Sequence, residues 1–332
     1  MSNTAIPSAA RALVHNPQTH DLTLLTPPVP TPTGPDEHLL AVHAVALTNG
    51  ELSWPEPATV SPHAIPGYEV SGTVIAAPPD SPFQPSADVY ARTAFDRPGS
   101  ARPYSIALTA ELGRKPQNLS WEAAATVPLS ALTAWQALFD HGGLAAPGDE
   151  SSLSRNRSKR ILITAAAGGV GLWAVQLAKL AGVDHIVGTC GSTNAGFVLG
   201  LGADEVVDYT VVSDLASWVS DRGRFDLVLD CVGGSTLEQA WLCVKADNGM
   251  LISIVQPPEM RKPQVGISDN VRSLFFIVEA NGRQLEKITS LIEQKKCTTV
   301  VDSAFAFEEF GEAFDKVRGG HLRGKVVLSV AP

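Results

Sequence analysis

The chain has 332 residues, of which 44% are hydrophobic and 18% are charged, and its formal net charge is −9 at pH 7. It is long enough for two domains with sizeable cores, and its acidic balance argues against a nucleic-acid surface. No apolar stretch reaches the roughly 18 residues of a membrane span, and no secretory signal opens the chain. We expect a cytoplasmic protein with reduced thiols that binds neither nucleic acid nor membrane.

The first part of the chain, up to about residue 127, is rich in proline and in short β segments such as Glu69–Ile75. This pattern is typical of a compact, partly barrelled β domain. Further on, a serine-rich stretch at 148–154 and the basic run Arg155–Arg160 come directly before a strongly apolar segment. Their polarity predicts a solvated loop between the β domain and that segment.

Residues 161–182 have the pattern of a buried strand, a glycine turn and a helix. The strand is apolar without alternation, which is typical of a parallel sheet covered on both faces. The turn is Ala166-x-Gly168-x-x-Gly171, with alanine in place of the usual first glycine, and the helix should end at Gly182. Such a turn presents backbone amides to a dinucleotide pyrophosphate, although a tight turn without a ligand is the alternative. The residues expected at the pyrophosphate are Ala166, Gly168, Gly169 and Val170.

Further strands alternate with helical segments at His185–Thr189, Phe225–Asp230 and Met250–Val255. This order predicts an α/β fold with a doubly wound parallel sheet. Ligands of such sheets bind outside the carboxyl ends of the strands. Val232 and Ile254, near two of those ends, are therefore candidate cofactor contacts.

The end of the second of these strands indicates which dinucleotide is bound. Cys190 stands where NAD-binding proteins normally carry an acidic residue that accepts hydrogen bonds from the adenosine ribose. Ser192, Thr193 and Asn194 follow, and none of them brings a carboxylate that would repel a 2′-phosphate. Together with Tyr209 they predict NADPH, held through neutral hydrogen bonds. The alternative is that Ser192, Thr193 and Asn194 only cap the next helix.

Several ordered segments carry a resemblance to a known family. They are Ala41–Leu47, Ile65–Gly72, Ala123–Leu138, Ala166–Lys179, Leu201–Tyr209, Asp230–Gly234 and Gly319–Val327. Over nearly its full length, the chain resembles a zinc-independent medium-chain dehydrogenase/reductase of the quinone oxidoreductase and enoyl reductase group. The resemblance implies a Rossmann domain beside a discontinuous, mainly β GroES-like catalytic domain, with the active site in the cleft between them.

The resemblance also implies where the domains begin and end. Residues 1–127 would form the catalytic domain, and residues 128–280 the NADP(H)-binding domain. Residues 281–332 would return to complete the catalytic domain through a helix near Gln284–Gln294 and a strand at Lys325–Val330. The expected partner is a small-molecule substrate. The chain would be either a homodimer or a monomer.

The cysteines distinguish the two branches of this family. All four lie late in the chain, at positions 190, 231, 243 and 297, and their spacing fits neither a metal cluster nor a disulfide scaffold. Thr48 and Tyr68 stand where the zinc branch carries a cysteine and a histidine ligand. The resemblance therefore implies an enzyme without metal that transfers hydride from NADPH to an activated C=C bond or a quinone, where a hydrogen-bond donor suffices.

Two residues are candidates for that donor. The phenol of Tyr68 would lie close to the nicotinamide, and the alternative is that Tyr68 packs as a half-buried strand residue. Thr48 occupies a position where many quinone reductases carry asparagine, so it is a second candidate for a polar contact. Glu51 and Trp54 are expected to line the cleft wall.

Other cofactor contacts follow from the resemblance, each with a plainer alternative. Thr133 would lie near the nicotinamide phosphate, or would bond only its own helix backbone. Phe276 and Val278 would pair with the carboxamide, or would belong to an ordinary strand or dimer edge. Lys325 would reach the cofactor phosphates, or would be a surface lysine.

Three classes of function therefore fit the sequence. The first is an NADPH-dependent reductase of an activated alkene or a quinone. The second is a biosynthetic tailoring enzyme, such as a stand-alone enoyl reductase on a polyketide-type substrate. The third is a non-catalytic NADPH-binding protein.

Overall fold

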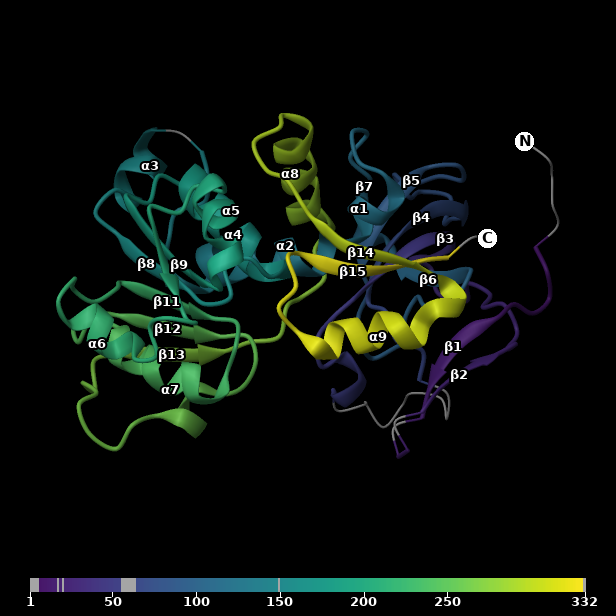
Figure 1. Cartoon of the computed structure of the whole chain (residues 1–332). Coiled ribbons are helices and arrows are strands. Elements are labelled where there is room, and N and C mark those ends of the chain that lie inside the picture. The colour runs from purple at the N-terminus through teal and green to yellow at the C-terminus, as the bar shows by residue number, and fades with distance from the viewer. Residues whose placement is uncertain (1–5, 17, 20, 55–63, 149, 331–332) are drawn as a thin grey trace. The chain divides into compact units, whose positions relative to one another are not determined.

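The computed structural model describes residues 6–16, 18–19, 21–54, 64–148 and 150–330, and the chain forms two compact units (Figure 1). The first unit combines residues 1–132 with residues 279–332, and the second contains residues 133–278. One unit is built on a mainly antiparallel sheet and the other on a parallel sheet. The predicted fold class, a doubly wound parallel sheet with a discontinuous β domain, is confirmed.

The first unit contains a seven-stranded sheet with the order β14-β15-β3-β4-β5-β7, in which β6 also pairs with β3. Its strands are β3 (Glu37–Leu47), β4 (Glu69–Ala76), β5 (Asp88–Arg92), β6 (Tyr104–Leu108), β7 (Leu112–Arg114), β14 (Val301–Ala306) and β15 (Lys325–Ser329). A separate antiparallel pair consists of β1 (Ala12–His15) and β2 (Leu22–Leu25). The helices are α1 (Trp121–Ala125), α2 (Pro128–Trp135), which continues into the second unit, α8 (Gly282–Glu293) and α9 (Phe310–Gly319). The strands predicted at 69–75 and 325–330 and the helix near 284–294 are confirmed.

The core of this unit lies between its sheet strands and α9. Buried Ala313, Phe314 and Val317 of α9 pack in one cluster with apolar residues of β3, β4 and β15. The backbones of β3 and β4 approach closely at Gly72, where an added methyl carbon would lie 2.4 Å from the carbonyl oxygen of Ala41. A glycine is therefore required there, and it keeps these two central strands paired.

The second unit is a six-stranded parallel sheet with the order β10-β9-β8-β11-β12-β13. The strands are β8 (Arg160–Ile163), β9 (His185–Cys190), β10 (Glu205–Asp208), β11 (Leu227–Asp230), β12 (Met250–Ser253) and β13 (Arg272–Phe275). The helices include α3 (Glu150–Asn156), α4 (Gly169–Leu180), α5 (Ala195–Gly200), α6 (Leu215–Ser220) and α7 (Gly234–Cys243). The chain reverses its direction of travel across the sheet between β8 and β11. That reversal is the switch point at which open α/β sheets bind ligands.

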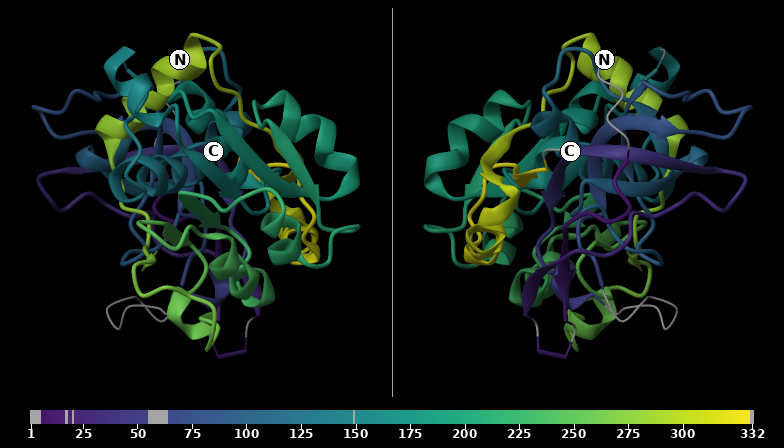
Figure 2. Two further views of the ribbon diagram at one scale, coloured as in Figure 1. Left: turned by 90° about the vertical axis from the view of Figure 1, so that its left-hand side faces the viewer. Right: turned by 90° about the vertical axis from the view of Figure 1, so that its right-hand side faces the viewer.

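Helices cover both faces of this parallel sheet, as Figures 1 and 2 show. Alternate strand residues such as Leu162 and Val228 share a cluster with Leu215 of α6 and Trp241 of α7. The strand residues between them are buried too, because α4 packs on β8 and β9 from the opposite side. Burial on both faces explains why these strands are apolar without alternation.

Two local predictions differ from the structure. Residues 150–156 form α3 instead of a solvated loop, and the buried Asn156 side chain donates to the carbonyl oxygens of Ala145 and Ala181. These two hydrogen bonds secure the end of a helix whose polar composition had indicated a loop. The strand near residue 275 ends at Phe275, so Phe276 and Val278 lie beyond it.

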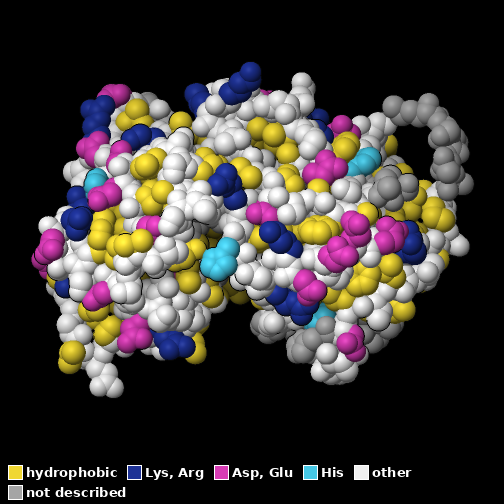
Figure 3. Space-filling view, in the orientation of Figure 1, with side chains coloured by type: hydrophobic (Ala, Val, Ile, Leu, Met, Phe, Trp, Pro, Cys, Tyr) yellow, Lys and Arg dark blue, Asp and Glu magenta, His cyan; other side chains and the backbone are white. Residues whose placement is uncertain are grey.

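Basic and acidic side chains are interspersed on the face shown in Figure 3, without a large area of one sign. Among the described helices, none has both the length and the apolar character needed to cross a membrane.

Candidate functional site

Several strand ends of the first unit meet at one edge of its sheet. Ala46 pairs with Glu69 in the β3–β4 register, and Leu47 pairs with Val326 in the β15–β3 register. Thr48, which follows β3, therefore lies beside the first residues of β4 and β15, Glu69 and Lys325. The sequence placed Thr48 and Tyr68 in the candidate site but gave no role to Glu69.

Lys325 and Glu69 form a buried ion pair at this edge. The Lys325 ammonium donates to the Thr48 hydroxyl oxygen at 2.8 Å and lies 3.1 Å from Glu69 Oε2. Glu69 Oε1 accepts hydrogen bonds from the backbone amides of Leu129 at 2.9 Å and Ser130 at 3.1 Å, in the first turn of α2. Hydrogen bonds from amides at the start of a helix stabilise a carboxylate.

Lys325 is 7% exposed and Glu69 is 0% exposed. The alternative that Lys325 is a plain surface lysine is therefore wrong, and the reason is the position of the residue as the first of a central strand. Contact between Lys325 and a cofactor phosphate stays a prediction.

Glu51 lies beside this ion pair, in the 3₁₀ turn Glu51–Ser53. It is 6% exposed, and neither of its carboxylate oxygens makes a hydrogen bond of normal geometry to a described residue. Burial raises the pKa of Glu51 to about 8, with Glu69 adding to the shift and Lys325 and the Thr48 backbone opposing it. Glu51 is thus a neutral carboxylic acid at neutral pH.

Tyr68 directly precedes β4 and is half-buried, and its ring stacks on that of Trp54 with centroids 6.0 Å apart. Gly67 before it has φ 88, and a methyl carbon there would lie 2.4 Å from the Val45 side chain. The backbone that presents Tyr68 therefore requires a glycine. Whether the phenol contacts a substrate stays a prediction.

A buried arginine next to Tyr68 has no equivalent in the sequence prediction. Arg92, at the end of β5, pairs with Glu69 in the β4–β5 register and is 4% exposed. Burial lowers the pKa of its guanidinium, and the nearby Glu111, Asp96 and Tyr68 oppose that shift. The only signal for this contact is the strand register, which the sequence does not contain.

The residues at this edge do not fit a zinc site. Zinc takes thiolate, imidazole and carboxylate ligands in tetrahedral geometry. Thr48 and Tyr68 offer hydroxyl groups, and burial raises the pKa of the distant thiols Cys243 and Cys297 to about 12. In the described part of the chain, no three histidine, cysteine, aspartate or glutamate side chains come together as a metal site.

The glycine turn of the second unit leaves room for a ligand at the start of α4. A methyl carbon on Gly171 would lie 2.2 Å from the Ala165 carbonyl oxygen, so this glycine is needed for close packing of the turn. At Gly168 the same carbon would meet only that oxygen, at 3.2 Å, and its other side is open. The amides of Gly169 and Val170 begin the helix, where an anion is favoured. The turn therefore fits a dinucleotide pyrophosphate.

Ala166 has a different role from the one expected. Its amide donates to the carbonyl oxygen of Thr189 at 2.8 Å, and its side chain is fully buried. Ala166 therefore ties the turn to β9, and the open side of the turn lies at Gly168.

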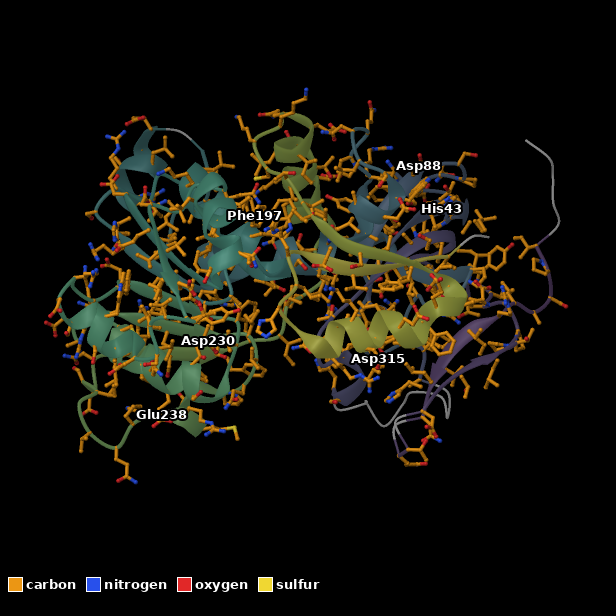
Figure 4. The ribbon with its side chains drawn as sticks, in the orientation of Figure 1. His43, Asp88, Phe197, Asp230, Glu238 and Asp315 are labelled. Atoms are coloured by element: carbon orange, nitrogen blue, oxygen red, sulfur yellow. The ribbon has the colours of Figure 1, made fainter. Side chains whose placement is uncertain are left out.

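Asp230, labelled in Figure 4, connects three strand ends at the switch point. It accepts hydrogen bonds from the hydroxyl groups of Thr164 at 3.2 Å and Ser253 at 2.8 Å, which follow or end β8 and β12. It also accepts from the Gly233 amide at 3.0 Å, which fixes the segment after β11. Beyond that segment Val232 and Val255 are each 47% exposed. These two apolar side chains suit a ring of a bound cofactor.

Residues 190–194 carry no carboxylate, as the sequence shows, but a carboxylate from another strand lies beside them. Cys190 is paired in register with Asp208, the last residue of β10, and the Ser192 hydroxyl donates to the Asp208 carboxylate. Thr210 also donates to Asp208, through its backbone amide at 2.9 Å and its hydroxyl at 2.6 Å. The carboxylate comes from the neighbouring strand, which is why inspection of residues 190–194 alone missed it.

The remaining predicted contacts lie in this unit as follows. Ser192, Thr193 and Asn194 form a 3₁₀ turn before α5 without a side-chain cap, so the capping alternative is not supported. Tyr209 is 46% exposed and has its hydroxyl oxygen close to Gly191. Thr133 is buried in α2, and Val278 is also buried. The backbone amide of Ile254 donates to the carbonyl oxygen of Asp230. The ring of Phe276 contacts the ring of His141.

Comparisons with known proteins agree with this architecture. Residues 201–328 match the family model described as zinc-binding dehydrogenase. The chain is 50% identical to a probable mitochondrial zinc-binding oxidoreductase of Arthroderma benhamiae, over 99% of each chain. It is 33% identical to the mitochondrial NAD(P)H oxidoreductase RTN4IP1 of Mus musculus, over 80% of this chain and 70% of that one. A quinone oxidoreductase from Coxiella burnetii has the same fold, with a TM-score of 0.81, 25% identity and coverage of 97% and 99%.

The relatives contradict the predicted cytoplasmic location, because those of Arthroderma benhamiae and Mus musculus are both named mitochondrial. The prediction rested on the lack of a secretory signal, which concerns a different route from import into an organelle. The resemblance to the reductase group is confirmed. The chain belongs to the medium-chain dehydrogenase/reductase family and is an oxidoreductase of the quinone-oxidoreductase type.

Proposed function

We propose that the protein is an NADPH-dependent reductase that transfers hydride to an activated C=C bond, as in an α,β-unsaturated carbonyl, or to a quinone, without a metal. The observation that carries the proposal is the hydrogen bond from buried Lys325 to the Thr48 hydroxyl at 2.8 Å. This hydrogen bond lies at the sheet edge where the zinc branch of the family has a metal ligand. This edge therefore offers a polarised hydroxyl group in place of a Lewis acid.

Thr48 acts as the donor in this proposal. Its oxygen accepts from the Lys325 ammonium, so its own hydrogen is available to a substrate oxygen. A donor polarised by a neighbouring cation makes a stronger hydrogen bond, which matters most when the acceptor carries developing negative charge. Thr48 is half-buried, so its hydroxyl is close to solvent-accessible space. Tyr68, next to Glu69 in the chain, is a second donor at the same edge.

The reaction is balanced without any metal or residue changing its oxidation state. When bound, the nicotinamide would be the source of the hydride that reaches the β-carbon of the substrate. The electron pair of the C=C bond then moves onto the carbonyl oxygen, which Thr48 stabilises as an enolate. A proton from water completes the reduction at the α-carbon, and the surrounding residues act by orienting the substrate.

Separate observations support NADPH and NADH as the dinucleotide that the protein binds. NADPH is supported by Cys190 in the place of the usual acidic residue, whereas the relative named an NAD(P)H oxidoreductase supports a nicotinamide cofactor of either kind. NADH is supported by Asp208, which brings a negative charge beside Ser192 and occupies the hydroxyl groups of Ser192 and Thr210. A 2′-phosphate at that place would meet repulsion instead of donors.

Replacing Asp208 with asparagine separates these candidates. If Asp208 limits NADPH binding, Asp208→Asn will raise the ratio of NADPH to NADH affinity by about tenfold or more, because a like charge is removed. Asp221→Asn, at the end of α6, is the matched control. Fluorescence titration with both dinucleotides measures the ratio, and an unchanged ratio would show that Asp208 has no part in the choice.

The proposed activity is tested in the same preparation by following nicotinamide absorbance with a small quinone and with an α,β-enone. Oxidation of the bound dinucleotide by either acceptor supports the reductase. Binding without oxidation by these acceptors would favour the tailoring enzyme on a polyketide-type substrate or the non-catalytic protein. The absence of binding would contradict the proposal.

We also propose that two copies pair through the parallel sheet. β13 is the last strand in the sheet order, so no strand of the described residues pairs with its outer edge. Ile277, just after it, is 54% exposed. Light scattering measures the mass in solution, and a strictly monomeric protein would contradict this proposal.

A further inference from the structure

Glu51 is a buried acid that the reaction described above does not use. The 3₁₀ turn that carries it begins after Gly50, whose φ of 80 lies in the left-handed region, and closes with a backbone hydrogen bond from Glu51 to Thr48 at 3.2 Å. This turn places the Glu51 side chain at 6% exposure. Neither oxygen of this buried acid makes a hydrogen bond of normal geometry to a described residue, and such burial has a cost that a simple packing role does not explain.

The groups that face Glu51 come from three elements. The charge of Lys325, which begins β15, and the backbone of Thr48, which follows β3, favour the ionised form of Glu51, whereas the charge of Glu69, which begins β4, disfavours it. The cluster thus contains one ammonium and two carboxyl groups. Glu69 has an ion pair with the ammonium through Oε2 and accepts two backbone amides through Oε1, whereas neither Glu51 oxygen makes a hydrogen bond of normal geometry to a described residue. Because burial raises the pKa of Glu51 to about 8, the proton stays on Glu51 at neutral pH.

We propose that neutral Glu51 is a positioning residue for the reduction, because it leaves Lys325 bound to Thr48 and Glu69, and that its ionisation draws Lys325 away from Thr48. This inference rests on the proposed function, in which Thr48 stabilises the enolate. Once Glu51 is an anion, two buried carboxylates compete for one ammonium. Thr48 then loses its cation, and the cluster carries a negative charge that opposes the enolate.

The proposal predicts a loss of turnover at alkaline pH. Because the pKa of Glu51 is raised to about 8, the neutral form predominates at neutral pH and disappears above it. We expect kcat with an enone to fall by about tenfold for each pH unit above about 8, as a single ionisation requires. The stage affected is hydride transfer, so KM for the dinucleotide should change little.

The matched variants are Glu51→Gln, which keeps the shape but cannot ionise, and Glu312→Gln, at an exposed position on α9. The alkaline fall should disappear in Glu51→Gln, whatever its plateau, and should persist in Glu312→Gln. Titration of Lys325 itself would leave the fall in place in Glu51→Gln, and that result would overturn the proposal. If Glu51→Gln does not fold, Glu51→Met, with a side chain of similar length, serves the same comparison.

A second readout does not depend on turnover. Infrared difference spectra of the full chain should show the carbonyl band of a protonated carboxylic acid at neutral pH, which is lost as the pH passes about 8. The band should be absent in Glu51→Gln and present in Glu312→Gln. A carboxylic acid band that is missing in the unaltered protein would overturn the assignment of the proton to Glu51. If the band titrates but no acceptor is reduced, the proposed function fails and the protonation of Glu51 stands.

Discussion

At the scale of single residues, the site of the first unit is organised by Lys325. The sequence offered this lysine only as a phosphate contact or a surface residue, whereas its ammonium is enclosed by Thr48 and Glu69. A buried ion pair contributes through its complete set of hydrogen bonds, and the loss of one member leaves the other charge without compensation. Lys325 is therefore both a structural residue and the source of the polarisation of Thr48.

Lys325→Met tests that role. Removal of the ammonium leaves the Glu69 anion buried with its two amide partners only, which should lower the free energy of unfolding by about 3–5 kcal/mol. The matched control is Lys316→Met, because Lys316 is 47% exposed and lies 3.6 Å from Asp302. That change should cost less than about 1 kcal/mol. Denaturant unfolding measures both, and equal losses would show that the Lys325 pair is no more important than a surface pair.

Glu51→Gln has a second consequence, for stability. The folded state keeps a proton on Glu51 up to pH about 8, whereas the unfolded chain releases it near 4.5. The contribution of Glu51 to stability is therefore fully present below pH 4.5 and is lost as the pH rises to about 8, at about 1.4 kcal/mol per pH unit. Glutamine does not titrate, so the stability of Glu51→Gln relative to the unaltered protein should increase across this window.

Thermal unfolding at several pH values measures this difference. The exposed control Glu312→Gln should show a constant difference from the unaltered protein across the same window. A constant difference for Glu51→Gln as well would contradict the raised pKa.

At the scale of elements, the strand–turn–helix of residues 160–180 was predictable because its signals are local. The apolar run of β8, the glycine spacing and the apolar face of α4 all lie within a short stretch of sequence. The two glycines, Gly168 and Gly171, have different roles in the turn. Gly171 is required by packing against Ala165, whereas Gly168 leaves open space at the helix start.

Gly168→Val should therefore weaken dinucleotide binding without a large loss of stability. The branched side chain would occupy the open side of the turn, and we expect Kd to rise by about tenfold or more, which corresponds to about 1.4 kcal/mol. Gly196→Ala, in α5, is the control, because no atom lies within 4 Å of an added methyl carbon there. If folded Gly168→Val binds the dinucleotide as tightly as the unaltered protein, the turn is not the pyrophosphate site.

At the scale of the whole molecule, the unit with the parallel sheet is inserted in the chain between the two parts of the other unit. β14 and β15, from the last part of the chain, join β3 in the same sheet as the first strands. The resemblance to the family implied this return, and the alternation of strands with helices in the sequence predicted the parallel sheet.

The contacts that the sequence did not predict arise between segments far apart in it. Lys325 meets Thr48 across 277 positions, and the Asp208 carboxylate meets Ser192 from the next strand. Such contacts depend on which strand ends lie side by side, and this follows from register. Helix α3 was missed for a similar reason, because Asn156 finds its partners at Ala145 and Ala181.

The most direct test of the account is the rate of dinucleotide oxidation by an enone in protein dialysed against a strong chelator, with metal content measured on the same sample. If Thr48, polarised by Lys325, supplies the donor as proposed, metal-free protein should keep the rate of the untreated protein, and added zinc should not raise it. A rate that is lost with the metal and restored by zinc would contradict the central claim.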